Sequence, residues 1–428
     1  MRRVLCPVEN LYVAQRSRAV LSCALDGPVD TAALSAAFEA VTAEQPTLLA
    51  RVVPDGDGHA LELLPETEQP RLRIRTGGEE DYAKELNRPL TVGGPLTRAV
   101  LVSDPDEERH TLVLTVDHVI TDGHSAIALL NTLWDRYRER IGGAPALSPP
   151  AAGLPGPISR LLPQVDEAET AKFLEARVEE AGRHPVELVE YDVRTPGEAS
   201  GSIEVQRLLL DTETTSRLRQ RARAEGLSVH GLIGAALLLA ARRRLDGTGS
   251  RILRCMSPVD LRSRLSPPVP ADVMVAAVTA HFQDLAVAED TDVLELARQV
   301  AGGLRDFFDR GDHFEAMRIM PMVPQHPTLH LGTVIVTNMG AVSGPRLPTG
   351  THVTDVRLVP AREHYFPQAG RSPLMACVAS FDGRLAIEFP HHTACFSRPF
   401  MRELRDEVLA ALCALADSDE ERHLAATA

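Results

Sequence analysis

The sequence predicts a mixed α/β protein built from two halves of similar kind. Its 428 residues exceed what one ordinary hydrophobic core holds. In each half, short apolar runs typical of strands alternate with amphipathic stretches typical of helices. A proline-rich connector at about residues 144–163 separates the halves. We therefore predict an N-terminal lobe over residues 1–185, which includes this connector, and a C-terminal lobe over residues 186–428.

The first half begins with a predicted strand over residues 19–25, which Gly27 and Pro28 terminate. Asp30 is placed to cap a helix over residues 31–44, whose apolar side chains recur on one face. A return strand is expected after Pro46. A strand followed by a helix over residues 111–140 completes this half.

The second half opens with a polar helix over residues 164–182 and a strand over residues 205–211. Two helices are predicted next, the second apolar and capped by Ser228, and then a strand over residues 251–260. The remaining pattern indicates strands over residues 331–340, 374–382 and 384–392 and a last helix that starts at Ser397.

Charge and composition exclude several classes of protein. A net charge of −14 argues against binding of nucleic acid or of acidic membrane surfaces. No stretch of 18 apolar residues predicts a membrane span, and the N-terminus lacks the apolar core of a signal peptide, so we expect a cytoplasmic location. The six cysteines lie far apart without a CxxC pair, which favours reduced thiols over disulfides or a metal site.

The segment over residues 111–134 carries the strongest functional signal. Its strand is almost wholly apolar, as in a central strand that is covered on both faces. An amphipathic helix follows, so the loop between them is held at a position where sites recur in α/β proteins. The ionisable and small residues of this loop are Asp117, His118, Asp122, Gly123, His124 and Ser125.

Three kinds of chemistry suit this loop. The segment Gly123–Ile127 begins like the G-x-S-x-G nucleophile elbow of serine hydrolases, but its fifth residue is isoleucine where the tight turn needs a small residue. A metal site formed by His118, Asp122 and His124 has no support from further ligand spacing. The third possibility is a lone histidine that takes a proton from an alcohol or amine as it attacks a thioester.

Residues 118–123, HVITDG, resemble the HxxxDG core of the HHxxxDG motif of the chloramphenicol-acetyltransferase-like superfamily, which includes nonribosomal condensation domains. Within it, the chain looks most similar to the polyketide-associated protein (Pap) acyltransferases. Residues 26–52 resemble the opening helix and strand of that superfamily. Residues 257–265 resemble its P-x-D-x-R element, and residues 337–340 resemble the strand that crosses between its halves.

The resemblance implies two chloramphenicol-acetyltransferase-like lobes, each a mixed sheet with helices, that meet at a central channel. It makes His118 the general base and Gly123 the residue that leaves backbone room beside it. Asp122 is expected to face away from the reactants and to pair with Arg262.

Other site residues are assigned as candidates. Thr337 or Asn338 is the candidate donor to the oxyanion, and His124 is a candidate substrate contact. Ser125 is expected to cap the helix. Asp117 replaces the first histidine of the motif, and we expect a structural or tuning role in which its charge raises the pKa of His118.

The implied function is O-acyl transfer from acyl-CoA, or from a carrier-protein thioester, to a hydroxyl of a polyketide or related secondary metabolite. Neither a metal nor a redox cofactor is needed, because the thioester is a co-substrate. The expected partners are the acyl-CoA donor, the hydroxylated acceptor and an acyl carrier protein. The alternatives are a condensation-type catalyst that makes an amide and a non-catalytic member that recruits a partner.

Overall fold

The computed structural model describes residues 1–78, 80–104, 108–143, 153–193, 201–330, 332–362 and 370–427. The chain divides into two compact units. Unit 1 contains residues 1–163, 261–278 and 342–364, and unit 2 contains residues 164–260, 279–341 and 365–428. The predicted ranges 1–185 and 186–428 differ from these units, since two segments from the second half of the chain lie within unit 1.

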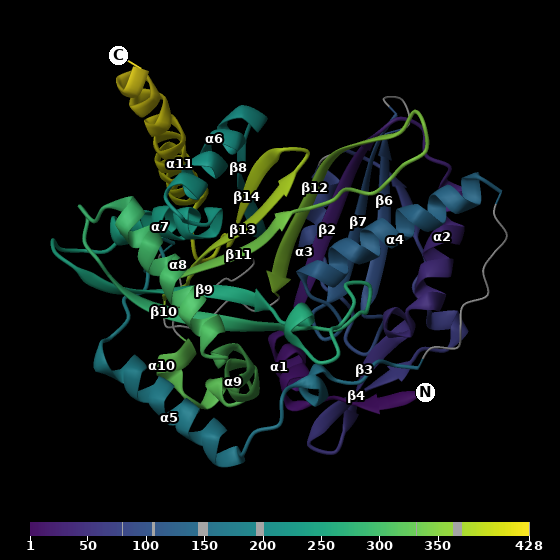
Figure 1. The fold of residues 1–428 in the computed structure, drawn as a ribbon. Helices are drawn as coiled ribbons and strands as arrows, with labels where there is room; N and C mark the ends of the chain where they lie inside the picture. The colour runs from purple at the N-terminus through teal and green to yellow at the C-terminus, as the bar shows by residue number, and fades with distance from the viewer. Residues whose placement is uncertain are drawn as a thin grey trace. The chain divides into compact units, whose positions relative to one another are not determined.

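Unit 1 is organised around a five-stranded sheet with the order β12-β2-β7-β6-β5 (Figure 1). Its helices and strands are β1 (Arg2–Val4), α1 (Pro7–Gln15), β2 (Ser17–Asp26), α2 (Thr31–Glu44), β3 (Ala50–Asp55), β4 (Gly58–Leu63), β5 (Arg73–Thr76), α3 (Glu80–Asn87), β6 (Thr97–Asp104), β7 (Arg109–Asp117), α4 (Gly123–Ile141) and β12 (His352–Arg362). Helices α2 and α4 pack against each other beside this sheet.

Strand β7 is the central strand of this sheet, as its apolar sequence predicts. It pairs antiparallel with β2 on one side and with β6 on the other. Leu112, Val113, Leu114 and Val116 are each at most 1% exposed. Because both edges and both faces of β7 are covered, its end is a rigid platform for the loop that follows.

The predicted return strand after Pro46 has a different place. Residues Pro46–Leu49 form a 3-10 turn, and β3 begins only at Ala50. This strand joins a separate three-stranded sheet with the order β1-β4-β3.

Asp30 caps α2 as predicted, since its Oδ1 accepts from the backbone N–H groups of Ala32 and Ala33 at 2.9 Å.

Unit 2 contains a six-stranded sheet with the order β10-β9-β11-β13-β14-β8. Its helices and strands are α5 (Glu167–Arg183), β8 (Ile203–Leu210), α6 (Thr212–Ala224), α7 (Val229–Arg242), β9 (Arg251–Asp260), β10 (Val278–Val287), α8 (Val293–Asp309), α9 (Asp312–Ile319), α10 (Pro327–His330), β11 (Val334–Ala341), β13 (Leu374–Phe381), β14 (Arg384–His392) and α11 (Arg398–Thr427).

Helix α7 is the buried centre of unit 2. Every residue from Gly231 to Arg242 is buried, and the helix contacts α8, α11 and strands β9, β11 and β13. A side chain at Gly231 would come within 3.0 Å of the carbonyl oxygen of Ala297 in α8. Glycine at this position therefore permits the close approach of the two helices. Ser228 caps α7 through its Oγ, which accepts from the N–H of Gly231 at 3.1 Å.

The prediction that residues 337–340 cross between the halves is wrong. They belong to β11, which pairs parallel with β9 and β13 inside the sheet of unit 2. The strand from the second half that enters the sheet of unit 1 is β12, which pairs antiparallel with β2 over residues 352–362. An apolar run predicts a strand but does not specify the sheet in which it pairs.

Part of the predicted connector, residues 144–152, lies outside the described residues. The described remainder contains a 3-10 turn over Ile158–Leu161. Within the described part of the chain, no single helix is long and apolar enough to cross a membrane. The pair α6 and α7 reaches that length and composition together, with a bend of 100° at its break.

Candidate active site

The candidate site is the loop between β7 and α4 in unit 1. The backbone N–H of His118 donates to the carbonyl of Ser17 at the start of β2, at 3.0 Å. The backbone N–H of Asp117 donates to the carbonyl of Leu96 at 2.9 Å. The loop is thus tied to neighbouring chain segments on both sides, so the position of His118 is set by the sheet.

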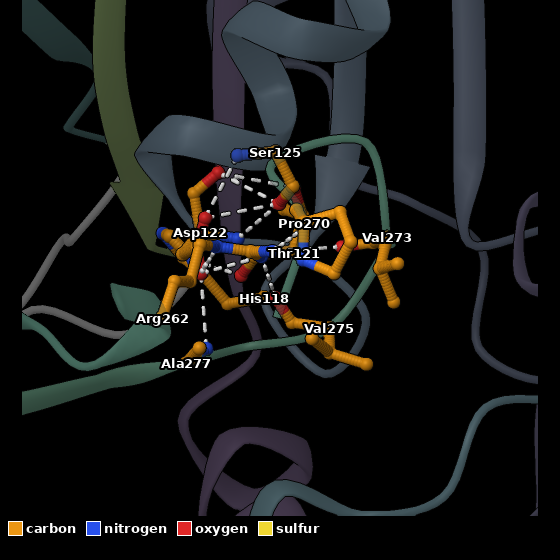
Figure 2. A network of polar contacts seen from close by, with 9 residues as sticks. All are labelled: His118, Thr121, Asp122, Ser125, Arg262, Pro270, Val273, Val275 and Ala277. Atoms are coloured by element: carbon orange, nitrogen blue, oxygen red, sulfur yellow. Dashed lines mark hydrogen bonds and ion pairs between the residues drawn. The ribbon is translucent and has the colours of Figure 1, made fainter. Parts of the chain in front are cut away.

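The imidazole of His118 is fixed in one tautomer by a bond within its own loop. Its Nδ1 lies 3.1 Å from the carbonyl oxygen of Thr121 (Figure 2). A carbonyl oxygen accepts only, so Nδ1 carries the proton and donates it. In the neutral ring Nε2 therefore holds the lone pair, and Nε2 is the atom that can take a proton from a substrate.

Two residues from distant parts of unit 1 complete the surroundings of His118. The ring of Tyr12 in α1 stacks on the imidazole, with ring centroids 6.1 Å apart and an interplanar angle of 28°. Arg362 ends β12, and it lies opposite Ser17 in the register of β12 and β2. Burial raises the pKa of Tyr12 to about 12, so this ring is neutral at physiological pH.

The pKa of His118 is lowered from its ordinary value of 6.5. Burial is the main cause, because it disfavours the charged imidazolium, and the positive charge of Arg362 acts in the same direction. The bond to Thr121 and the negative charge of Asp122 raise the pKa but do not outweigh burial. The expectation that the charge of Asp117 raises the pKa of His118 stays a prediction, because the net shift is set mainly by burial.

The lowered pKa of His118 predicts how turnover depends on pH. A general base acts only when it is neutral, so kcat/KM should rise with pH through the pKa of His118 and reach a plateau. We expect the midpoint of that rise below pH 6.5, because the pKa is lowered. Arg362→Gln removes a positive charge and should move the midpoint to higher pH. A wild-type midpoint above 6.5, or an unchanged midpoint in Arg362→Gln, would contradict this account.

The carboxylate of Asp122 accepts five hydrogen bonds and has two separate tasks (Figure 2). Its Oδ1 accepts from the backbone N–H of Ser125 at 2.8 Å and from the Ser125 hydroxyl at 3.0 Å. Asp122 is thus the N-cap of α4. Its Oδ2 accepts from Arg262 and from the backbone N–H of Ala277 at 2.9 Å.

The predicted pair of Asp122 and Arg262 is confirmed. Arg262 Nε and Nη2 lie 3.1 Å and 2.9 Å from Asp122 Oδ2, and both side chains are at least 95% buried. Both N–H groups converge on one carboxylate oxygen, because the other caps α4. The remaining N–H groups of Arg262 donate to the carbonyls of Pro270, Val273 and Val275 at 2.7 to 3.1 Å. Every donor of this arginine has a partner, which suits a buried ion pair.

The structure assigns Ser125 to the helix start rather than to nucleophilic chemistry. Its side chain is fully buried, and its Oγ accepts from the N–H of Asp122 at 3.0 Å. Together with the Asp122 cap this completes a reciprocal capping box. The prediction that Ser125 is itself the cap is thus corrected, since the cap is Asp122. The five donors on Asp122 also leave its carboxylate unsuited to serve as a metal ligand.

Asp117 has a local structural contact. Its Oδ1 accepts from the backbone N–H of Val119 at 2.9 Å, which closes the turn after β7. Its carbonyl accepts from the N–H of Ile120 at 3.1 Å. This geometry supports the structural role that we expect for the residue at the first position of the motif.

The remaining candidates lie in different places. Gly123 and His124 are the first two residues of α4, and both are partly exposed. Thr337 and Asn338 lie in β11 of unit 2, where Asn338 Oδ1 accepts from the N–H of Gly340 at 2.8 Å. Their assignments as substrate or oxyanion contacts stay predictions.

Sequence reasoning missed Tyr12 and Arg362, for which no motif or spacing gave a signal.

A family model and curated relatives match the sequence of this chain. Residues 199–390 match the family model described as "Phthiocerol/phthiodiolone dimycocerosyl transferase C-terminus". A phthiocerol/phthiodiolone dimycocerosyl transferase of Mycobacterium sp. (strain JLS) is 26% identical over 368 residues, which cover 83% of this chain and 85% of that protein.

Solved structures share the whole fold. Polyketide synthase associated protein 5 from Mycobacterium tuberculosis superposes with a TM-score of 0.75 at 21% identity, over 97% of this chain and 98% of the other. The first condensation domain of the calcium-dependent antibiotic synthetase superposes with a TM-score of 0.71 at 19% identity, over 97% of this chain and 96% of that domain.

The fold class is therefore the chloramphenicol-acetyltransferase-like one, with a mixed sheet and helices in each unit. The resemblance to the polyketide-associated acyltransferases is confirmed, and the chain is an acyltransferase. The family model matches the second half of the chain, whereas the full-length relatives also cover the loop with His118.

Proposed function

We propose that the chain transfers an acyl group from a thioester to a hydroxyl of a polyketide lipid or a related secondary metabolite. The observation that carries this proposal is the fixed tautomer of His118, whose Nδ1–H donates to Thr121 and whose Nε2 is left as the base. Acyl transfer by direct attack needs one positioned base and no enzyme nucleophile. The acceptor class follows from the names of the relatives, which are transferases of phthiocerol and phthiodiolone.

In the proposed reaction, His118 Nε2 takes the proton of the acceptor hydroxyl as its oxygen attacks the thioester carbonyl. The new carbon–oxygen bond forms a tetrahedral intermediate, whose collapse breaks the carbon–sulfur bond. The proton on His118 then passes to the leaving thiolate, and the base returns to its neutral form. Donors from Thr337 or Asn338 are the proposed stabilisers of the intermediate.

The donor is proposed to be acyl-CoA or an acyl carrier protein thioester, in a cytoplasmic reaction that needs neither a metal nor a redox cofactor. The lowered pKa of His118 supports this chemistry, because a base that is neutral at physiological pH is ready to accept a proton. The buried Asp122–Arg262 pair supports it as well, since it holds the loop without using either charge on substrate.

A condensation-type catalyst that forms an amide is the alternative, because condensation domains share this fold. The discriminating experiment supplies palmitoyl-CoA with 1-octanol or octylamine, a matched pair that differs in the attacking atom. We expect an ester at a rate that depends on the alcohol, and a kcat/KM for the amine at least about tenfold lower. Preferred amide formation would favour the condensation-type alternative. Slow loss of the thioester without an acceptor-dependent product, for wild type and His118→Ala alike, would favour a non-catalytic protein.

A further inference from the structure

Unit 2 contains a cavity whose lining includes none of the residues assigned to the proposed reaction. The hollow and the solvent-filled space at its opening together measure about 670 Å³, and α5, β10, α8 and α9 contribute to its walls. Three phenylalanine side chains line it, namely Phe173, Phe282 and Phe307, together with aliphatic side chains from residues 319–329. Such a lining favours a ligand with a flat, apolar body.

One buried nitrogen atom in the wall lacks a hydrogen-bond partner among the described residues. This atom is Nε2 of His281, whose residue is only 7% exposed. The imidazole is held against Phe307, with ring centroids 4.6 Å apart. A buried polar atom without a partner carries a free-energy penalty that a bound hydrogen-bonding group would remove.

The charge state of His281 restricts the group that can meet it. Burial lowers the pKa of His281 to about 4, so the ring is neutral at physiological pH. A neutral imidazole nitrogen either donates or accepts, depending on the tautomer. A hydroxyl group suits both cases, because it is a donor and an acceptor at once.

The charged side chains in the wall neutralise one another. Arg254 Nε lies 2.5 Å from Asp284 Oδ1, and Arg177 Nη1 lies 2.6 Å from Glu180 Oε2. A third pair joins Arg310 and Asp312 at 2.7 Å. Each cation of the lining thus has an anion of the lining as its partner, so an ionic ligand would have to break one of these pairs.

We propose that this cavity binds a small neutral molecule that consists of an aromatic ring and a hydroxyl group, with the hydroxyl bonded to Nε2 of His281. The ring occupies the space between the phenylalanine side chains. The residues of this site belong to unit 2, whereas His118, Asp122 and Arg262 belong to unit 1. The proposed binding site can therefore be tested separately from the proposed acyl transfer, and failure of one proposal does not decide the other.

The test compares 4-methylphenol with p-xylene, which have nearly the same shape and differ by a hydroxyl in place of a methyl group. Isothermal titration calorimetry of the full chain should show saturable binding of 4-methylphenol at one site. We expect p-xylene to bind about tenfold more weakly, because it leaves His281 Nε2 unpaired. Equal affinities, or no saturable binding of 4-methylphenol because water alone fills the cavity, would overturn the proposal.

Two variants and one control locate the site. His281→Phe keeps a ring in the wall but removes the nitrogen, so it should abolish the preference for 4-methylphenol. Ala316→Phe places a large side chain into the lining and should abolish the binding of both probes, with circular dichroism showing that the fold is retained. His118→Ala should bind 4-methylphenol as wild type does. Unchanged binding in His281→Phe and Ala316→Phe, or lost binding in His118→Ala, would contradict a site in unit 2.

Discussion

His118→Ala is expected to lower turnover by about 10²- to 10⁴-fold, the usual effect of removing a general base. The loss should appear in kcat, because Nε2 takes the proton only as the hydroxyl attacks. The fold should survive, since the hydrogen bond of the His118 side chain goes to a carbonyl of its own loop and links no other element. Steady-state kinetics with an acyl-CoA donor and an alcohol measures the turnover, and chemical denaturation measures the stability of the fold.

The matched control for this variant is Ser125→Ala in the same loop. Its hydroxyl contributes to the capping box of α4, so its loss should cost about 1 kcal/mol of unfolding free energy. Most of the turnover should remain. A loss of turnover as large as that of His118→Ala would restore the serine hydrolase alternative, and near-normal turnover of folded His118→Ala would refute the general-base mechanism.

Asp122→Ala is expected to destabilise the protein by roughly 3–5 kcal/mol, because it leaves the charge of Arg262 buried without its partner. It also removes the N-cap of α4 and the acceptor of the Ala277 N–H. Turnover should fall as well, since Asp122 adjoins Thr121, whose carbonyl orients His118. Urea denaturation and the kinetics of the folded variant separate the two effects.

A double-mutant cycle tests whether the two residues act as a unit. Arg262→Ala should be about as damaging as Asp122→Ala, and the double variant should be less damaged than the sum of the two. Asp122→Asn keeps an oxygen that can cap α4 but removes the charge, so its stability should lie between wild type and Asp122→Ala.

The exposed pair of Arg346 and Asp135 is the control for the cycle. Arg346 is 73% exposed, so Arg346→Ala should cost less than about 1 kcal/mol. In the cycle itself, the structural role of the Asp122–Arg262 pair is refuted if the double variant loses as much unfolding free energy as the two single variants together.

The sequence by itself determined those features that depend on neighbouring residues. The apolar run of residues 112–116 predicted a central strand, and the structure has β7 there. Asp30 and Ser228 predicted two helix starts because a cap acts on N–H groups two or three residues away. The loop with His118 was found in the same way, since its strand, motif and helix are contiguous in the chain.

The tertiary structure alone decided which distant segments surround that loop. Arg262 lies 140 residues from Asp122, and the family resemblance rather than any local pattern indicated the pair. Nothing in the sequence indicated that Tyr12 stacks on His118, or that β12 brings Arg362 to the start of β2. The direction of the pKa shift at His118 also had to come from the structure, because burial outweighs the negative charge of Asp122. Periodicity and capping report on contacts within a few residues, whereas the pairing of strands, burial and the field at a side chain depend on segments that only the packed chain brings together.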